Sequence, residues 1–388
     1  MSRLVFVHGP WQLLVAASAL KQASESSGDG AWNTLVIYSL HSATVPGPIR
    51  EVMCRMAPAL GPWRRVIVLD PSIEWDLRDA RPSIEALRAR LDVDEPDEVW
   101  LDALWVGPEK GVAEAYPGAR IVLYEDGLHT YLETEDHHVS AARCLREPRA
   151  AYRSMRLRLR ERMRPDNLSL SPMLPRHLAR VSASYLWISL MLPPPAYQRR
   201  LPWAQIQPRF LGETIDRVSP LADEVVLDGG SGPTAVVLGQ CFSNYGDLAR
   251  DVELDLYIEM ARRLQEMGYE VLWKEHPRTR RPFLPDLVEA VAGVQGLPDL
   301  GPWPIEVFAK RLGLAACASL TSTSLFNFPL LFGLSSFSTA GRYLSSFRFP
   351  NDLMAQLVAK SIPQFDEGGT RPTSRPVVST VSSEATPP

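Results

Sequence analysis

The sequence contains few cysteines and few lysines, and its net charge is small. The cysteines form no CxxC pair and lie in or beside apolar runs, so we expect reduced core residues of a cytosolic protein rather than disulfides or zinc ligands. The net charge of only −4 argues against a dedicated nucleic-acid-binding protein, so no nucleic-acid partner is expected. The four cysteines are Cys54, Cys144, Cys241 and Cys317.

Apolar runs long enough to cross a bilayer are also missing. The longest strongly apolar run, residues 185–192, is too short to span a membrane and ends in three prolines. No charged leader with a cleavage site precedes the first apolar run. We therefore expect a cytoplasmic protein.

The chain does contain short apolar runs that alternate with helix-like patterns, as at residues 83–91. This alternation predicts an α/β fold with parallel sheets covered on both faces. The turn after the first run does not read GxGxxG, so a dinucleotide fingerprint is absent. The predicted strands of the first half lie at residues 4–7, 34–40, 66–69, 99–104 and 120–124, and the pattern restarts at residues 234–238.

The length of 388 residues allows two domains with full cores. Residues 167–219 look irregular and proline-rich, and the glycine-rich DGGSGP segment at 228–233 is typical of a hinge. We predict domains at residues 1–228 and 229–364. A tail at 365–388, dense in proline, serine and threonine, is predicted to be disordered.

An acidic motif follows the predicted strand 120–124. Glu125, Asp126 and Gly127 emerge at its carboxyl end, where ligands bind in open α/β sheets. One carboxylate could act as a general base, while Gly127 lets a substrate approach the backbone. Asp-Gly is also a common turn dipeptide, so an ordinary turn is the alternative.

A histidine ends the predicted strand within residues 269–278, YEVLWKEHPR. Pro277 cannot donate to a sheet ladder, so the strand must stop and His276 lies at its carboxyl end. Such a histidine can act as a general acid or contact a phosphate. A histidine that only forms part of a strand-terminating turn is the alternative.

Further polar groups in the second half are typical of a nucleotide site. Glu306 is predicted in the first turn of a helix running through Lys310, where it could bind ribose hydroxyls or simply favour the helix dipole. A hydroxyl run at 321–324 precedes a helix predicted from Leu325, and could cradle a phosphate or provide an ordinary cap. The residues assigned to the donor side are Gln240, Pro277, Glu306, Ser322, Thr323 and Ser324.

A basic amphipathic helix is predicted at residues 148–164. Arg153 and Arg156 belong to an arginine stripe beside an apolar stripe. The stripe could be a solvated face, or could attract an anionic polymer or the inner membrane leaflet. Nearby, residues 133–138 hold acids and two adjacent histidines, which we interpret as an acidic loop because no spaced ligand set accompanies them.

Together these motifs resemble bacterial sialyltransferases, most closely the alpha-2,8-polysialyltransferase family. Those proteins carry a D/E-D/E-G motif, an HP motif and a Ser/Thr motif, which correspond here to 125–127, 276–277 and Ser322-Thr323. The opening GPWQLL at 9–14 is similar to S-P-x-Q-L-L, with Gly9 in place of serine and Gln12 retained. The resemblance covers about residues 4–343 and implies two Rossmann-like domains facing across a cleft, the GT-B type.

The resemblance also implies an inverting transfer of sialic acid or a related nonulosonic acid from a CMP-sugar to an acceptor hydroxyl. Glu125 is assigned as the base with Asp126 as the alternative, because strand alternation points the two side chains to opposite faces. His276 would neutralise or protonate the departing phosphate. Gly9, Gln12, Arg153 and Arg156 are placed on the acceptor side.

No metal or cofactor is expected beyond the donor, since a monophosphate leaving group carries less charge than a diphosphate. A glycan acceptor, anionic if the arginine stripe contacts it, and peripheral contact with the inner membrane face are the other expected partners. The alternatives are a transferase for Kdo or for a UDP- or GDP-sugar, a sugar-nucleotide epimerase, and a non-catalytic capsule-assembly module.

Overall fold

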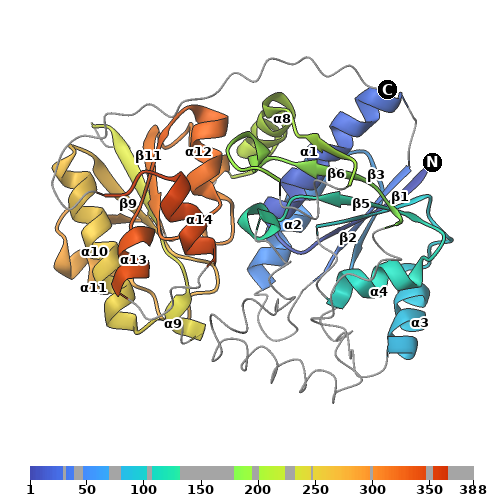
Figure 1. Ribbon diagram of the computed structural model, residues 1–388, viewed down its shortest axis with the longest axis horizontal. Coiled ribbons are helices and arrows are strands. Elements are labelled where there is room, and N and C mark those ends of the chain that lie inside the picture. The colour runs from blue at the N-terminus through green and yellow to red at the C-terminus, as the bar shows by residue number, and fades with distance from the viewer. Residues whose placement is uncertain are drawn as a thin grey trace, which may run out of the picture.

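The structure, a computed structural model, places the polypeptide in two parallel α/β sheets that lie side by side (Figure 1). It describes residues 1–28, 32–38, 47–69, 80–102, 107–131, 179–194, 201–222, 232–245, 248–297, 300–346 and 353–365.

The first sheet has seven strands within the described residues, all paired in parallel. In their order β3-β2-β1-β4-β5-β6-β7, β2 and β3 lie on one side of β1, and the chain then continues on the other side with β4. The carboxyl ends of β1, β4 and β5 therefore lie next to one another. Crevices at such a reversal are the usual ligand sites of open α/β sheets. The strands are β1 Ser2–Val7, β2 Trp32–Ile37, β3 Trp63–Val68, β4 Glu98–Leu101, β5 Arg120–Tyr124, β6 Val181–Leu186 and β7 Trp203–Gln205.

Helices cover both faces of this sheet because successive side chains of a strand point to opposite sides. In β1, Val5 and Val7 join one core cluster with α1 and α2, whereas Leu4 and Phe6 join another with α3 and α4. The helices are α1 Pro10–Ser27, α2 Gly47–Leu60, α3 Ala80–Leu91, α4 Gly107–Ala115 and α8 Pro208–Val218, with short 3-10 turns η1 Gly127–Tyr131, η4 Ile188–Leu190 and η6 Ser219–Ala222.

The second sheet has five strands within the described residues, in the order β10-β9-β8-β11-β12. They are β8 Thr234–Leu238, β9 Glu270–Lys274, β10 Gln295–Gly296, β11 Leu314–Ser319 and β12 Ser335–Ser338. The accompanying helices are α9 Phe242–Tyr245, α10 Arg250–Glu266, α11 Leu284–Ala290, α12 Ser324–Phe332, α13 Ala340–Ser346 and α14 Leu353–Ser361, with the 3-10 turn η8 Ile305–Val307.

Helix α8 joins the two halves. It packs on α1 and α2 of the first half and against α12 and η8 of the second (Figure 1). Its buried residues, Phe210, Leu211, Thr214, Ile215 and Val218, form one face of the helix. A single hydrophobic cluster therefore runs through both halves.

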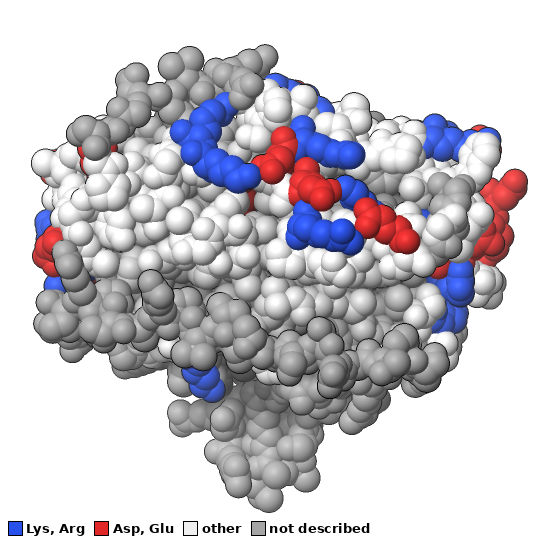
Figure 2. Space-filling view, turned by 90° about the horizontal axis from the view of Figure 1, so that it is seen from above, with Lys and Arg blue, Asp and Glu red and all other residues white. Residues whose placement is uncertain are grey.

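Polar contacts accompany this packing. The Ser219 hydroxyl donates to Val307 O at 3.0 Å, and Arg311 Nη2 donates to Ala222 O at 2.7 Å. On the surface, Lys310 pairs with Asp216 at 2.7 Å. The face seen from above in Figure 2 shows basic and acidic side chains that alternate, and such exposed pairs each add little stability.

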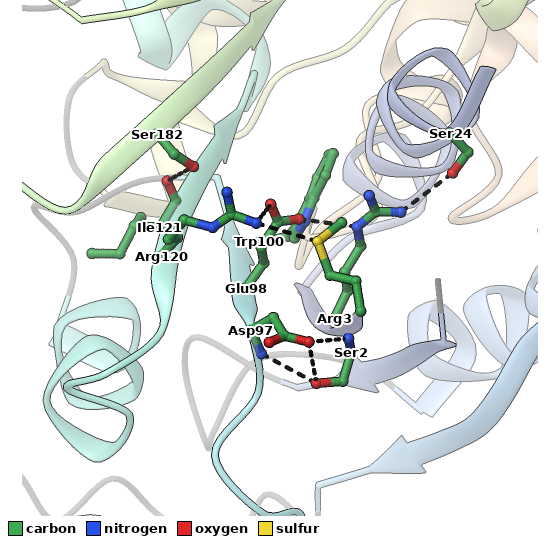
Figure 3. Close-up of polar contacts among 10 residues, drawn as sticks. Ser2, Arg3, Ser24, Asp97, Glu98, Trp100, Arg120, Ile121 and Ser182 are labelled. Atoms are coloured by element: carbon green, nitrogen blue, oxygen red, sulfur yellow. Dashed lines mark hydrogen bonds and ion pairs between the residues drawn. The ribbon is translucent and has the colours of Figure 1, made fainter. Parts of the chain in front are cut away.

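Ion pairs link the amino ends of β1, β4 and β5 (Figure 3). Glu98 is buried and pairs with Arg3 at 3.0 Å and with Arg120 at 3.0 Å. The indole N–H of Trp100 donates to the same carboxylate at 3.1 Å. These pairs link three adjacent strands whose carboxyl ends carry the site.

Three expectations from the sequence are wrong. The segment 167–219 is not simply irregular, because it contains β6, β7 and α8. No regular helix runs from Glu306 through Lys310; this described segment forms only the 3-10 turn η8 followed by further turns. Cys54 is exposed rather than a core residue.

Several predictions fall on residues outside the described parts. They include the domain boundary at 228/229, the arginine-rich helix with Arg153 and Arg156, the acidic loop at 133–138, Cys144, and all of the tail after Phe365. Among the described helices, none is long and apolar enough to cross a membrane.

Candidate active site

Glu125, the first acid of the motif after β5, is completely buried. Its Oε2 accepts hydrogen bonds from the Tyr131 hydroxyl at 2.7 Å, the Trp187 N–H at 2.5 Å and the Ile188 N–H at 2.8 Å. Burial raises the pKa of Glu125 to about 8, although these three hydrogen bonds act in the opposite direction. A carboxyl group enclosed in this way cannot reach an acceptor hydroxyl without rearrangement.

Asp126, the second acid, has a different environment. Its side chain is 16% exposed, against 0% for Glu125. The Gln12 amide donates to Asp126 Oδ1, and the Asp126 N–H donates to the Thr130 hydroxyl at 2.8 Å. The two acids therefore have different surroundings, since Glu125 is enclosed and Asp126 is partly exposed, and which of them acts as the base stays a prediction.

Gly9 allows Gln12 to reach Asp126. It is the N-cap of α1 in an extended conformation, and Pro10 begins the helix. A Cβ at Gly9 would collide with the Gln12 side-chain oxygen, at the amide that donates to Asp126. The lack of a side chain at Gly9 therefore leaves room for the observed position of this amide.

His8 and Asp102 complete the surroundings of Asp126. They directly follow β1 and β4, the two strands before β5 in the sheet. The ring Nε2–H of His8 donates to Asp102 Oδ2 at 2.6 Å, and the same nitrogen lies 3.7 Å from Asp126 Oδ1. The three side chains offer ligand atoms within 4.8 Å of one another, so they could hold a divalent metal ion.

The acidic motif contacts the hydroxyl motif of the second half. The Leu128 N–H donates to Thr323 Oγ1 at 3.3 Å. Gly127 adopts the left-handed region with φ of 77°, and a Cβ there would lie 2.5 Å from the same oxygen. Two motifs 195 residues apart in the sequence thus meet directly.

The remaining hydroxyls lie at the start of α12. Thr323 is its N-cap residue, but the Thr323 hydroxyl makes no capping bond to the helix. Ser322 Oγ instead accepts the N–H of Ser324 at 3.2 Å, and Ser324 is buried. Ser322 and Thr323, both partly exposed, are therefore better placed for a ligand than Ser324.

His276 lies just beyond β9 in a tight turn with Pro277, and both residues are partly buried. The turn is closed by the Thr279 N–H, which donates to His276 O at 2.9 Å. Ring Nδ1 accepts the Arg278 N–H at 3.2 Å, so a neutral ring carries its hydrogen on Nε2. Burial, together with the positive charges of Lys274 and Arg278, lowers the pKa of His276 to about 3.

The role predicted for His276 stays a prediction, and its low pKa bears on how the ring could act. With this pKa the ring is uncharged at neutral pH in the ligand-free protein. It can still donate a hydrogen bond from Nε2. The neighbouring Glu275 caps α11. Its Oε1 accepts the N–H groups of Phe283 and Leu284 at 2.5 and 2.9 Å.

Glu306 is 3% exposed and its Oε1 accepts a hydrogen bond from Asn327 Nδ2 at 2.6 Å. Gln240 follows β8, where its N–H donates to the Tyr257 hydroxyl at 2.7 Å and its side-chain amide donates to Ser319 Oγ at 3.3 Å. Gln240 thus lies just beyond the carboxyl end of β8, and Glu306 lies in η8, which packs against α12.

Residues 3–340 match the family described as Alpha-2,8-polysialyltransferase (POLYST). The chain belongs to this family. The resemblance predicted from the motifs is therefore confirmed, and this member of the polysialyltransferase family is a glycosyltransferase. A comparison with curated proteins finds no match.

Solved bacterial sialyltransferases share the fold. The alpha/beta-galactoside alpha-2,3-sialyltransferase of Photobacterium phosphoreum is 11% identical with a TM-score of 0.52, covering 94% of this chain and 98% of that one. The 2,6-sialyltransferase of Photobacterium sp. JT-ISH-224, solved with CMP and lactose, is 12% identical with a TM-score of 0.51, covering 94% and 78%. The GT-B domain of the Photobacterium damselae enzyme is 10% identical with a TM-score of 0.50, covering 94% and 100%. The predicted GT-B fold is confirmed.

Sequence reasoning missed four residues around the site of this polysialyltransferase-family chain: His8, Asp102, Trp187 and Asn327. His8 and Asp102 each follow an apolar strand directly, which is the same signal that identified Glu125 and Asp126. Trp187 and Asn327 give no such signal, because both lie within largely apolar segments.

Proposed function

We propose that the protein transfers sialic acid or a related nonulosonic acid from a CMP-sugar to a hydroxyl of an acceptor glycan, with inversion and without a metal ion. The observation that carries this proposal is the contact between Gly127 and Thr323, which brings the acidic motif and the hydroxyl motif together. Donor and acceptor groups must come within bonding distance for transfer, so such a junction is what the chemistry needs.

Asp126 is the proposed general base. The acceptor hydroxyl must lose its proton as it attacks an oxocarbenium-like carbon, and a partly exposed carboxylate can take that proton. Gln12 fixes one oxygen of Asp126, and the His8–Asp102 pair lies beside it. Glu125 is proposed to support the backbone after β6 rather than to take part in proton transfer.

His276 is proposed to stabilise the departing phosphate. Its neutral ring offers Nε2–H as a donor, and the Ser322 and Thr323 hydroxyls at the start of α12 can add further hydrogen bonds. Thr323 would exchange its contact with Leu128 for the phosphate or keep both. Gln240, Pro277 and Glu306 are proposed to hold the nucleotide, with Glu306 on the ribose hydroxyls.

The acceptor side is proposed to include Gly9 and Gln12 near Asp126. Arg153 and Arg156, outside the described residues, are proposed to attract an anionic glycan or the inner membrane surface. An anionic acceptor agrees with the family's name, since a growing sialic acid polymer carries one carboxylate per unit.

The test is a transfer assay with CMP-Neu5Ac and two acceptors, an oligosialic acid and neutral lactose. We expect release of CMP that requires an acceptor, a product heavier by one or more sialic acid units, and unchanged rates after EDTA treatment. Consumption of a UDP- or GDP-sugar but not of CMP-Neu5Ac would overturn the donor assignment. Loss of activity in EDTA, restored by Mn²⁺, would instead assign the His8, Asp102 and Asp126 cluster to a metal.

A further inference from the structure

Asn327 is completely buried on α12 and uses both ends of its side-chain amide. Its Oδ1 accepts the indole N–H of Trp187 at 3.0 Å, and its Nδ2 donates to Glu306 Oε1 at 2.6 Å. An indole nitrogen can only donate, and a carboxylate can only accept. The orientation of the amide is therefore fixed by its two partners.

Asparagine suits this position better than residues of similar size. Leucine would leave the buried Trp187 N–H and Glu306 without these partners, which is costly in the interior. Aspartate would place a second carboxylate against Glu306. The position needs a short side chain with one acceptor and one donor, and asparagine provides both.

The chain of hydrogen bonds continues into the first half of the protein. The Trp187 backbone N–H donates to Glu125 Oε2 at 2.5 Å, while the indole of the same residue reaches Asn327. Trp187 is itself completely buried. The buried chain Glu125–Trp187–Asn327–Glu306 therefore links the acidic motif after β5 with η8 beside the second sheet.

We propose that Asn327 is a positioning residue, which orients Glu306 toward the ribose of the donor nucleotide and is itself held by Trp187 from the other half. The inference rests on the proposed function, in which a CMP-sugar binds with its ribose at Glu306. A glutamate side chain has three rotatable bonds, and fixing one carboxylate oxygen in advance reduces the entropy lost when the other oxygen meets a ligand.

The experiment measures ribose discrimination as the ratio of dissociation constants for 2′-deoxy-CMP and CMP, determined by calorimetry on the full chain. A hydrogen bond to a charged group predicts a wild-type ratio of about 10 or more. Glu306→Gln is the reference for a weakened ribose contact, and Asn327→Leu should lower the ratio to below about 3. Trp187→Phe, which removes only the indole N–H and keeps an aromatic ring, should give an intermediate ratio.

Phe328→Leu is the matched control. Phe328 is equally buried on α12 but packs against Phe332, so its loss lowers stability without touching the hydrogen-bond chain. It should keep the wild-type ratio, whereas a general loosening of α12 would lower the ratio in this variant too and overturn the inference. If Asn327→Leu does not fold, Trp187→Phe carries the test.

A wild-type ratio retained in Asn327→Leu, or in Trp187→Phe where that variant carries the test, would overturn the positioning role. A ratio retained in Glu306→Gln would overturn the assignment of Glu306 to the ribose and with it the inference, while leaving CMP-sugar transfer in place. A wild-type protein that binds no CMP would contradict the proposed function itself, so the two failures are distinguishable.

Discussion

Gly127 and Thr323 touch across the two halves of the protein. A Cβ on Gly127 would lie 2.5 Å from Thr323 Oγ1, and the next N–H, from Leu128, donates to that oxygen at 3.3 Å. Position 127 requires glycine for two reasons. A Cβ would collide with Thr323, and the backbone has a positive φ of 77°, which side chains disfavour. The same glycine that lets the chain turn after β5 lets the hydroxyl motif approach.

Gly127→Ala should lower stability by roughly 2–4 kcal/mol, from left-handed backbone strain and from collision with Thr323. Adding Thr323→Ala removes the colliding atoms, so the double variant should recover the steric part but not the backbone part. Chemical denaturation of both single variants and the double variant measures this coupling. Strictly additive losses would show that the two residues do not meet.

Gly9→Ala should fold normally, because its backbone is extended, but should displace the Gln12 amide from Asp126. We expect transfer to slow by about 10-fold, the worth of one hydrogen bond to a charged group. Gln12→Leu should slow transfer equally, and the double variant should be no worse than either. If the two changes slowed transfer independently, so that their effects multiplied in the double variant, they could not both act through the hydrogen bond between Gln12 and Asp126.

The buried Glu125 predicts a pH dependence of stability. Its folded-state pKa of about 8 lies above that of an unfolded chain, so the folded protein holds a proton that the unfolded chain releases. This contribution is fully present below about pH 4 and is lost as pH rises through 8. Glu125→Gln removes the titration, so its stability relative to wild type should rise by roughly 3–4 kcal/mol between pH 5 and 8. A constant difference across that range would argue against a protonated Glu125.

His276 should act as a neutral hydrogen-bond donor. Because its pKa is about 3, the kcat/KM of the enzyme should show no histidine titration between pH 5 and 7. His276→Phe should lower kcat by about 100-fold, as for loss of one donor to developing negative charge, and His276→Gln should recover part of it. An inflection near pH 6.5 that disappears in His276→Gln would restore the proton-donor role.

The strands were largely predictable from the sequence because each is a short apolar run bounded by polar or turn residues. Residues 120–124 and 234–238 match β5 and β8 residue for residue. The miss at 167–219 has a physical cause, since β6 contains small and polar residues that weaken the strand pattern. Helix α8 has a strongly apolar face, but it lies within a segment interpreted as irregular from its prolines.

The choice between the two acids could not be made from local sequence. Glu125 is enclosed by backbone groups that lie more than 60 residues further along the chain, and only the folded arrangement brings them together. The roles of Asn327 and Trp187 depend on a contact across 140 residues. Such long-range partners leave no periodic signal.

The central claim is that Asp126, rather than its neighbour Glu125, takes the acceptor proton, and paired kcat measurements test it most directly. With CMP-Neu5Ac and an oligosialic acid acceptor at pH 7, Asp126→Asn should lower kcat by about 10² to 10⁴-fold, while Glu125→Gln should stay within about 5-fold of wild type. The reverse result, with activity retained in Asp126→Asn and lost in a folded Glu125→Gln, would contradict the account.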